Sequence, residues 1–294
     1  VEFHTKMNSL NSEIMEVMDK AFNYVDQNGA GLVIGNEAGG MPGTFSAGAD
    51  LTLVSKLCHN KKYVELDTLV KKMQEGIMNL QYAPFPVVAA PYGLTLGGGC
   101  EVCLGADRIV AHAELYMGLV EIGVGLLPGG CGNLNLWKKY INAMPAKTAK
   151  DTDLAKLFVP ALMKVIMAAV SMSAAQAMGN GFLGQADRIV FNRDNLIGEA
   201  KKEVLKMVDD GYVPPTKQPL IVMGNAGQGM VNAEIFNMLN GKFISDHDAF
   251  LAKRIAYVMS GGDVNVGSAV DEDTILKLER EAFVDFCKEE KTIA

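Results

Sequence analysis

Two glutamates near the middle of the chain could act as an acid/base pair. Glu101 follows the triple glycine 97–99, and Glu121 lies twenty residues further along, in the segment Met-Gly-Leu-Val-Glu-Ile-Gly. Glycines let backbone N–H groups approach a ligand because no β-carbon intervenes. If a helix begins at the triple glycine, its first N–H groups lack helical partners and favour developing negative charge. The pattern predicts an oxyanion-stabilising turn beside two carboxylates, although a tight turn followed by two solvated glutamates would use the same residues.

Three further segments surround these residues and support the catalytic interpretation. Residues 45–51, Phe-Ser-Ala-Gly-Ala-Asp-Leu, follow the apolar run 31–35. Residues 86–93, Pro-Val-Val-Ala-Ala-Pro-Tyr-Gly, precede the triple glycine, and residues 125–130, Gly-Leu-Leu-Pro-Gly-Gly, follow Glu121. In this order and at this spacing, the motifs resemble those of the crotonase (enoyl-CoA hydratase/isomerase) superfamily.

The resemblance implies a role for each residue of the site. The N–H groups of Ala49 and Gly98 fall at the two oxyanion-hole positions, where they would hold the thioester oxygen of an acyl-CoA substrate. Glu101 and Glu121 fall at the two acid/base positions and would share one water molecule, one carboxyl ionised and the other protonated. The remaining positions of the CoA-ester site are Ala47, Gly48, Asp50, Leu51 and Gly97.

The presence of both glutamates favours one reaction within that superfamily. Relatives that isomerise double bonds generally lack one member of the pair, so the resemblance implies an enoyl-CoA hydratase of fatty-acid β-oxidation. Such an enzyme adds water syn to trans-2-enoyl-CoA and gives 3-hydroxyacyl-CoA. An enoyl-CoA isomerase or another crotonase activity stays an alternative, as does a non-catalytic acyl-CoA-binding or assembly module. No cofactor is expected in this region, because coenzyme A is part of the substrate.

Composition and charge agree with a globular enzyme. Hydrophobic residues make up 49% of the 294 residues and charged residues 21%, which is typical of a folded domain. The apolar stretch 158–170 is too short to span a bilayer and contains Lys164. The net charge is −7, and no basic cluster is interleaved with aromatics. We therefore expect neither a membrane nor nucleic acid as a partner. No signal-peptide pattern is visible at the start, which predicts a cytoplasmic protein.

Cysteines and histidines do not indicate a metal site or a hydrolase. Five cysteines, an odd number, argue against a disulfide framework and for a reducing compartment. Cys100 and Cys103 form a C-x-x-C pair within an apolar run, but the other three cysteines are too scattered to complete a zinc site. We interpret the pair as small buried residues. None of the four histidines lies beside a nucleophile motif.

The pattern of apolar residues predicts an α/β fold. Residues 32–34, 87–90 and 108–111 have the character of buried strands, and residues 63–81 that of an amphipathic helix. A second helical stripe covers 154–166. Asp151 and Thr152 are its candidate caps, and Pro160 is expected to kink or restart the helix. The resemblance implies a spiral of repeated ββα turns over residues 1–195, with a mainly helical region over 196–294.

The helical region is expected to cap the acyl pocket and to build a homotrimer or hexamer, as in the family. Residues 211–228 are interpreted as a loop-rich connection. Its glycine cluster, 224–229, has the order G-x-x-G-x-G and lacks a surrounding βαβ unit, so it does not indicate a dinucleotide site. The segment 137–153 is unusual for the family and is interpreted as an insertion.

The two ends of the sequence suggest a larger parent protein. Residues 1–3 are interpreted as lying inside the first strand, and the chain stops without the trailing segment we would expect. The surroundings of Glu121 and the segment 278–283 resemble the hydratase portion of fusions with 3-hydroxyacyl-CoA dehydrogenase. We therefore expect a fused or associated dehydrogenase, with NAD bound only in such a domain of the parent chain.

Overall fold

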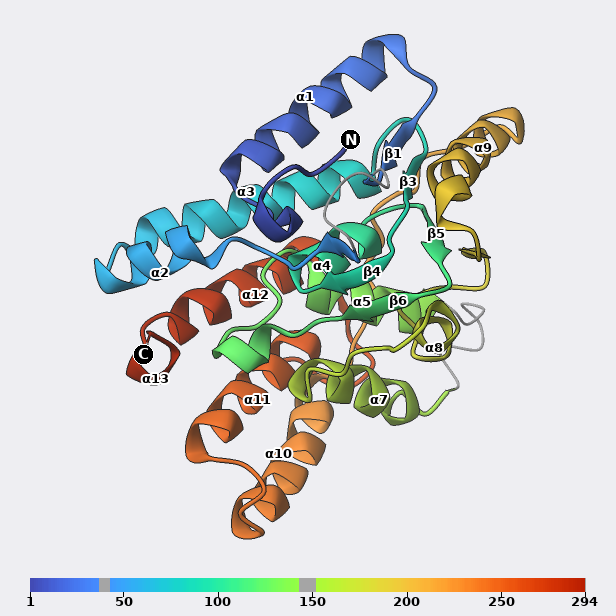
Figure 1. The fold of residues 1–294 in the computed structure, drawn as a ribbon. Coiled ribbons are helices and arrows are strands. Elements are labelled where there is room, and N and C mark those ends of the chain that lie inside the picture. Colours follow the sequence, from blue (N-terminus) through green and yellow to red (C-terminus); the bar gives the residue numbers. More distant parts are fainter. Residues whose placement is uncertain (37–42, 143–151, 294) are drawn as a thin grey trace. The chain divides into compact units, whose positions relative to one another are not determined.

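The computed structural model describes residues 1–36, 43–142 and 152–293, and the other residues are drawn as a grey trace in Figure 1. The chain divides into two compact units. The first unit comprises Val1–Leu51, Lys72–Leu119 and Val170–Lys217. The second comprises Thr52–Lys71, Val120–Ala169 and Gln218–Ala294. The functional division expected at residue 195 stays a prediction.

The first unit is built on two parallel sheets. One sheet has the order β1-β3-β5-β7, with β1 at Leu32–Ile34, β3 at Val87–Ala89, β5 at Arg108–His112 and β7 at Arg188–Val190. The other has the order β2-β4-β6, with β2 at Thr44–Ser46, β4 at Gly93–Leu96 and β6 at Leu115–Gly118. Strands β1 to β6 thus alternate between the two sheets and β7 joins the first, which confirms the predicted ββα spiral.

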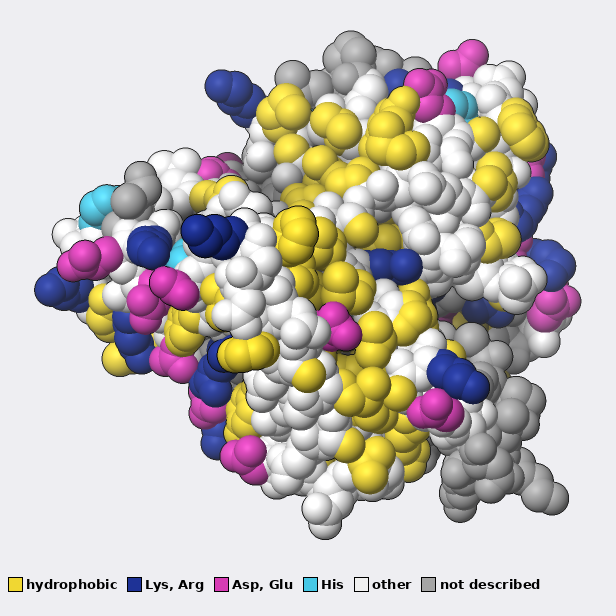
Figure 2. Space-filling view, turned by 90° about the horizontal axis from the view of Figure 1, so that it is seen from below, with side chains coloured by type: hydrophobic (Ala, Val, Ile, Leu, Met, Phe, Trp, Pro, Cys, Tyr) yellow, Lys and Arg dark blue, Asp and Glu magenta, His cyan; other side chains and the backbone are white. Residues whose placement is uncertain are grey.

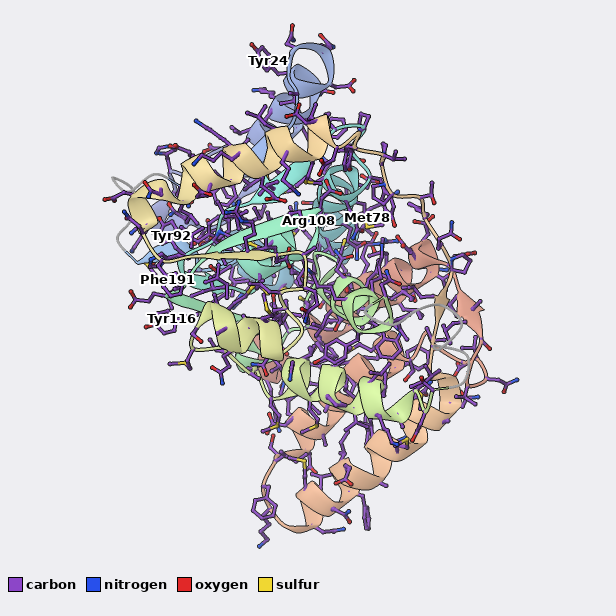
Figure 3. All side chains as sticks on the ribbon, turned by 90° about the vertical axis from the view of Figure 1, so that its right-hand side faces the viewer. Tyr24, Met78, Tyr92, Arg108, Tyr116 and Phe191 are labelled. Carbon is purple, nitrogen blue, oxygen red and sulfur yellow. The ribbon has the colours of Figure 1, made fainter. Side chains whose placement is uncertain are left out.

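The central strands are buried because their side chains are almost all apolar. Val87, Val88 and Ala89 of β3 are 0% exposed. Helix α9, at Leu196–Asp209, packs against β1, β3 and β5 and lies across these strands in Figure 3. Other helical segments that include residues of this unit are η1 (Lys6–Asn8), α1 (Ser12–Asn28), α2 (Leu51–His59), α3 (Tyr63–Gln81), α4 (Gly98–Leu104), α8 (Ala174–Gly179) and η3 (Arg193–Asn195).

The second unit is mainly helical. Besides most of α2 and the start of α3, its described helices are η2 (Glu121–Val124), α5 (Gly132–Asn142), α7 (Ala155–Ile166), α10 (Gly224–Asn240), α11 (Asp246–Met259), α12 (Glu272–Phe286) and α13 (Glu290–Ile293). Helix α11 packs against α5, α7, α10 and α12, and a small antiparallel pair joins β8 (Leu220–Ile221) to β9 (Ala269–Val270). The predominance of helix after residue 195 confirms the prediction for the C-terminal region.

Some apolar side chains remain at the surface, as the face drawn in Figure 2 shows. In the second unit, Phe236 is 65% exposed and Phe243 is 81% exposed. In the first unit, Phe191, labelled in Figure 3, is 84% exposed. Among the described residues, no helix is long and apolar enough to cross a membrane.

Several local predictions were wrong. The glycines of 224–229 are not in a loop but begin helix α10. Thr152 is not the N-cap of α7, because the helix begins at Ala155 and its N-cap is Leu154; the Asp153 side chain accepts from the N–H of Ala155 at 3.1 Å. Asp151, the other candidate cap, lies outside the described residues.

Two further predictions also need correction. Pro160 lies inside α7, which continues through it to Ile166, so the helix does not restart there, and the kink stays a prediction. Residues 1–3 form no regular strand, although the ammonium group of Val1 donates to the Val33 carbonyl of β1 at 2.7 Å. Of the expected insertion 137–153, residues 137–142 complete α5, and 143–151 lie outside the described residues.

Candidate active site

A glycine turn connects β4 to the short helix α4 in the first unit. Gly97, the residue before the helix, has φ 52° and ψ −125°, a conformation that a side chain would strain. Its N–H donates to the Gly118 carbonyl of β6 at 3.0 Å. A β-carbon on Gly99 would lie 2.6 Å from the β-carbon of Ser46, so glycine there lets α4 pack closely on β2. The triple glycine is therefore required by a sharp turn and a close packing contact.

Two backbone N–H groups meet at this turn without acceptors. Those of Ala49 and Gly98 donate to no acceptor among the described residues. The N–H of Asp50 instead donates to the Leu10 carbonyl at 2.8 Å. A β-carbon on Gly98 would stand only 3.2 Å from the Ala49 nitrogen, so the two N–H groups belong to neighbouring backbone segments. Two neighbouring N–H groups without acceptors can together stabilise an oxyanion.

Glu101 lies in the first turn of α4, close to these N–H groups in sequence. Its side chain is buried, with 2% of the residue exposed. Its own N–H donates to the Gly97 carbonyl at 3.0 Å, and its carbonyl accepts from Gly105 at 3.1 Å. The backbone of Glu101 is thus held by the helix that the glycine turn begins, and its carboxyl is withdrawn from solvent.

Glu121 begins η2 in the second unit. Both oxygens of its carboxyl are buried and have no hydrogen-bond partner among the described residues. The pKa of this carboxyl is raised from 4.5 to about 7, mainly by burial and with a smaller contribution from the charge of Glu279, against the lowering effect of the backbone N–H groups of Glu121 and Val120. A carboxyl with this pKa carries a proton in a large fraction of molecules at neutral pH, so it can act as a general acid.

The first unit contains every proposed oxyanion-hole and CoA-ester residue together with Glu101. A β-carbon on Gly48 would lie 3.3 Å from the Gly98 nitrogen, which places the segment 47–49 against the turn 97–98. Asp50 and Leu51 are exposed. Glu121 belongs to the second unit. The pairing of the two glutamates and the CoA contacts stay predictions.

The buried carboxylate of Glu279 was not predicted from the sequence. Glu279 of α12 is 0% exposed and accepts hydrogen bonds from backbone N–H groups of the α5 N-terminus. Its position carried a signal, because it falls on the helical stripe of buried residues Ile275, Leu276, Ala282, Phe283 and Phe286. An acidic residue on an apolar stripe needs buried partners.

Metal-ligating groups are not gathered in the described part of the chain. No group of three or more His, Cys, Asp or Glu residues among the described residues could hold a metal ion. The five cysteines are buried and form no disulfide. Cys100 and Cys103 lie in the buried helix α4, in agreement with their interpretation as small packing residues.

Comparison with known proteins agrees with this geometry. The model of the family described as enoyl-CoA hydratase/isomerase matches residues 1–209. A Bacillus subtilis (strain 168) protein named probable 3-hydroxyacyl-CoA dehydrogenase is 38% identical over 294 residues, which are 100% of this chain and 36% of that protein. A Rickettsia felis protein named putative fatty acid oxidation complex trifunctional enzyme is 28% identical over 98% of this chain and 36% of its own length.

Solved structures show the same fold. A crystal structure described as an enoyl-CoA hydratase from Bacillus anthracis superposes with a TM-score of 0.53 at 21% identity. The superposition covers 86% of this chain and 82% of that one. The chain thus matches this structure over most of its length, whereas it spans little more than a third of the two relatives described above.

Proposed function

Because the chain belongs to the enoyl-CoA hydratase/isomerase (crotonase) family, we propose that it hydrates trans-2-enoyl-CoA to 3-hydroxyacyl-CoA, a step of fatty-acid β-oxidation. The observation that carries the proposal is the pair of N–H groups of Ala49 and Gly98, which have no acceptors among the described residues. These would bind the thioester oxygen and stabilise the enolate that forms there. One such donor is typically worth about 3–4 kcal/mol in the transition state.

In the proposed mechanism, the two glutamates move the protons. Ionised Glu101 removes one proton from a water molecule, and the water oxygen bonds to Cβ of the substrate. The π electrons of the double bond move onto the thioester oxygen and form the enolate. Protonated Glu121 then delivers its proton to Cα, which restores the carbonyl. The transfer leaves Glu101 protonated and Glu121 ionised, and exchange with solvent resets both.

One feature supports this assignment of roles, and a second supports a common site for the two glutamates. The raised pKa of Glu121 favours the protonated form that an acid needs, so Glu101 is assigned the role of base. The sequence also favours a common site, because Glu121 follows Gly118 by three residues and Gly118 is hydrogen-bonded to Gly97 beside the open N–H groups.

Heavy-oxygen labelling tests the proposal against isomerisation. In water enriched in oxygen-18, the protein should place the label at Cβ of crotonyl-CoA and of longer trans-2-enoyl-CoAs, detected by mass spectrometry of the product. A 3-enoyl-CoA should react slowly. Rapid conversion of the 3-enoyl substrate without label at Cβ would assign the protein as an isomerase. Absence of both reactions, with acyl-CoA binding retained, would indicate a non-catalytic module.

The relatives suggest how the reaction is connected to the next one. The product would carry a 3-hydroxyl group, the group that a 3-hydroxyacyl-CoA dehydrogenase oxidises, and one relative bears that name. We therefore include a fused or associated dehydrogenase, with NAD bound there, in the proposal. A full-length protein supplied with enoyl-CoA and NAD should then produce NADH, and omission of NAD should stop the sequence at the 3-hydroxy compound.

A homotrimer or hexamer in the cytoplasm completes the proposal. The exposed Phe236 and Phe243 of the C-terminal helical region support contact between copies, and the buried cysteine thiols support a reducing compartment. Sedimentation equilibrium at micromolar concentration should show the assembly. A stable monomer would remove the oligomer from the proposal and leave the catalytic part untouched.

A further inference from the structure

Glu279 is a buried carboxylate that holds the N-terminus of helix α5. Its Oε1 accepts from the N–H of Cys131 at 2.8 Å. Its Oε2 accepts from the N–H of Asn133 at 3.1 Å and from Nδ2 of the same asparagine at 3.0 Å. A carboxylate that accepts several N–H groups is stabilised in its ionised form, and helix α5 contributes the favourable end of its dipole. Glu279 therefore carries a negative charge inside the second unit.

The segment held by Glu279 leads directly back to Glu121. The N–H of Leu126 donates to the Glu121 carbonyl at 3.0 Å, which closes the η2 turn. Residues 126–131 are then buried without interruption up to the N–H that Glu279 accepts. Nδ2 of Asn133 also donates to the Pro128 carbonyl at 3.0 Å. The segment 126–131 is thus held at one end by the Glu121 turn and at the other end by the hydrogen bond to Glu279.

The backbone conformation of Cys131 indicates that its hydrogen bond to Glu279 is needed. It has φ 70°, in the left-handed region that non-glycine residues seldom adopt. Such a residue persists only where its surroundings determine its conformation. The hydrogen bond from its N–H to Glu279 is one such constraint, and Gly129 packs on the Phe283 ring, where a β-carbon would lie 2.8 Å from a ring carbon.

We propose that Glu279 is a positioning residue for the reaction, which orients the Glu121 turn and whose negative charge favours the protonated form of Glu121. The proposal rests on the proposed role of Glu121 as the general acid. Like charges in a buried site oppose joint ionisation, so an ionised Glu279 makes the loss of the Glu121 proton less favourable. The raised pKa of Glu121, to which Glu279 contributes, agrees with this.

Other charged groups lie on the elements around the turn. Helix α7, which packs on η2, carries Lys156 and Lys164. His247 of α11 contacts Thr292, which donates to the Gly125 carbonyl just after η2, and α13 also carries Glu290 and Lys291. Helices α5 and α12 bear the Lys138–Glu272 ion pair. In the proposed mechanism Glu101 contributes a further negative charge. All of these stay unchanged when Glu279 alone is replaced.

The test compares pH profiles of hydration. In the wild type, kcat should fall as pH rises through about 7, where Glu121 loses its proton. In Glu279→Gln this descending limb should move to lower pH by about one unit, and kcat at pH 8 should fall about tenfold. Glu279→Asp keeps the charge and should keep the limb within about 0.3 units of the wild type.

Glu281→Gln is the matched control. It removes the same charge two residues away on α12, where the side chain is 46% exposed and pairs with Lys277 at 3.8 Å. The descending limb of its kcat–pH profile should coincide with that of the wild type. A folded Glu279→Gln protein whose limb coincides with that of the wild type would overturn the proposal.

Glu121→Gln separates this inference from the proposed function. If Glu121→Gln hydrates normally, Glu121 is not the acid and both the function and the inference fail. If it is inactive while the limb of Glu279→Gln stays in place, the inference alone fails.

Should Glu279→Gln not fold, carbon-13 NMR of the glutamate carboxyls in the wild type and in Glu279→Asp replaces the rate profile. A glutamate that titrates near pH 7 in both, and that is lost in Glu121→Gln, supports the proposal. Its absence from the wild type overturns the proposal.

Discussion

A β-carbon on Gly98 would stand 3.2 Å from the backbone nitrogen of Ala49. Glycine at residue 98 therefore leaves the space beside two N–H groups that have no acceptor among the described residues. The groups come from segments that are far apart in the sequence, and both are held by their flanking backbone: Gly97 donates to Gly118, and Asp50 donates to Leu10. Donors fixed before the substrate arrives need no reorganisation during the reaction, which is what electrostatic stabilisation of an oxyanion requires.

Replacement of Gly98 by alanine should inactivate the enzyme without unfolding it. The new methyl group would lie 3.1 Å from Cε of Met73 and 3.2 Å from Cδ1 of Leu10, and flexible side-chain ends such as these can give way. The Ala49 backbone is less able to move, so the substrate oxygen loses its place. We expect kcat for crotonyl-CoA to fall about a hundredfold. Gly198→Ala, at an exposed α9 position with no atom within 4 Å, should keep full activity. Normal turnover by Gly98→Ala would refute the oxyanion-hole assignment.

Replacement of either glutamate by glutamine should affect turnover far more than binding. Glu101→Gln and Glu121→Gln keep the size of the side chain but remove the group that exchanges a proton. Each should lower kcat by about a hundredfold or more. The dissociation constant of a saturated acyl-CoA, measured by calorimetry, should change less than about threefold, because the CoA ester is held mainly by the segment 47–51 in our proposal. A variant that hydrates at the wild-type rate would exclude that glutamate from the acid/base pair.

The buried carboxyl of Glu121 should make the protein less stable at high pH. Its pKa is about 7 in the folded protein against 4.5 for an ordinary glutamate. The folded state therefore binds this proton more tightly, so the contribution is fully present below about pH 4.5 and is lost as pH rises through about 7. Glu121→Gln cannot titrate. Its free energy of unfolding, relative to that of the wild type, should rise by about 3 kcal/mol from pH 4.5 to pH 8. Urea unfolding of both proteins at the two pH values measures this, and an equal difference at both would contradict the raised pKa.

The ion pair between Lys138 of α5 and Glu272 of α12 should contribute strongly to the stability of the second unit. Nζ and Oε1 are 2.7 Å apart, and the side chains are only 13% and 2% exposed. Lys138→Met would leave the buried carboxylate without this counter-charge and should lower the free energy of unfolding by about 3 kcal/mol. Lys62→Met removes the exposed Lys62–Glu65 pair, whose Nζ and Oε1 are 2.8 Å apart, and should lower the free energy of unfolding by less than about 1 kcal/mol. Equal effects in urea unfolding would show that burial of the first pair has no consequence.

Local patterns in the sequence were sufficient to predict elements whose conformation depends on neighbouring residues. The helix predicted over 63–81 has those bounds in the structure, and Leu66, Val70, Ile77 and Leu80 are buried as their helical spacing requires. The turn at Gly97 was likewise predictable, since its positive φ is a property that glycine alone adopts readily. Such features depend on residues a few positions apart, which the sequence presents together.

The glycine cluster 224–229 shows where tertiary packing overrides local preference. Glycine is a poor helix former, so a loop was the natural prediction. In the structure the cluster begins α10, because a β-carbon on Gly227 would lie 2.9 Å from Oγ of Ser260 and 3.0 Å from Cε1 of Phe158. The helix can approach α7 and the end of α11 only where side chains are missing. The information for that contact lies in residues more than thirty positions away.

The two glutamates of the second unit show the same division at the candidate site. The motif around Glu121 was sufficient to predict an acid/base role from the sequence. The environment that raises its pKa was not predictable, because it depends on burial and on the charge of Glu279, 158 residues further along the chain. In the sequence Glu279 falls on the apolar stripe of α12, which indicates a buried position but does not identify the groups that the carboxylate meets there. Only the packing of α12 against α5 decides that this carboxylate is hydrogen-bonded to the N-terminus of α5, because those hydrogen-bond partners come from a distant part of the chain.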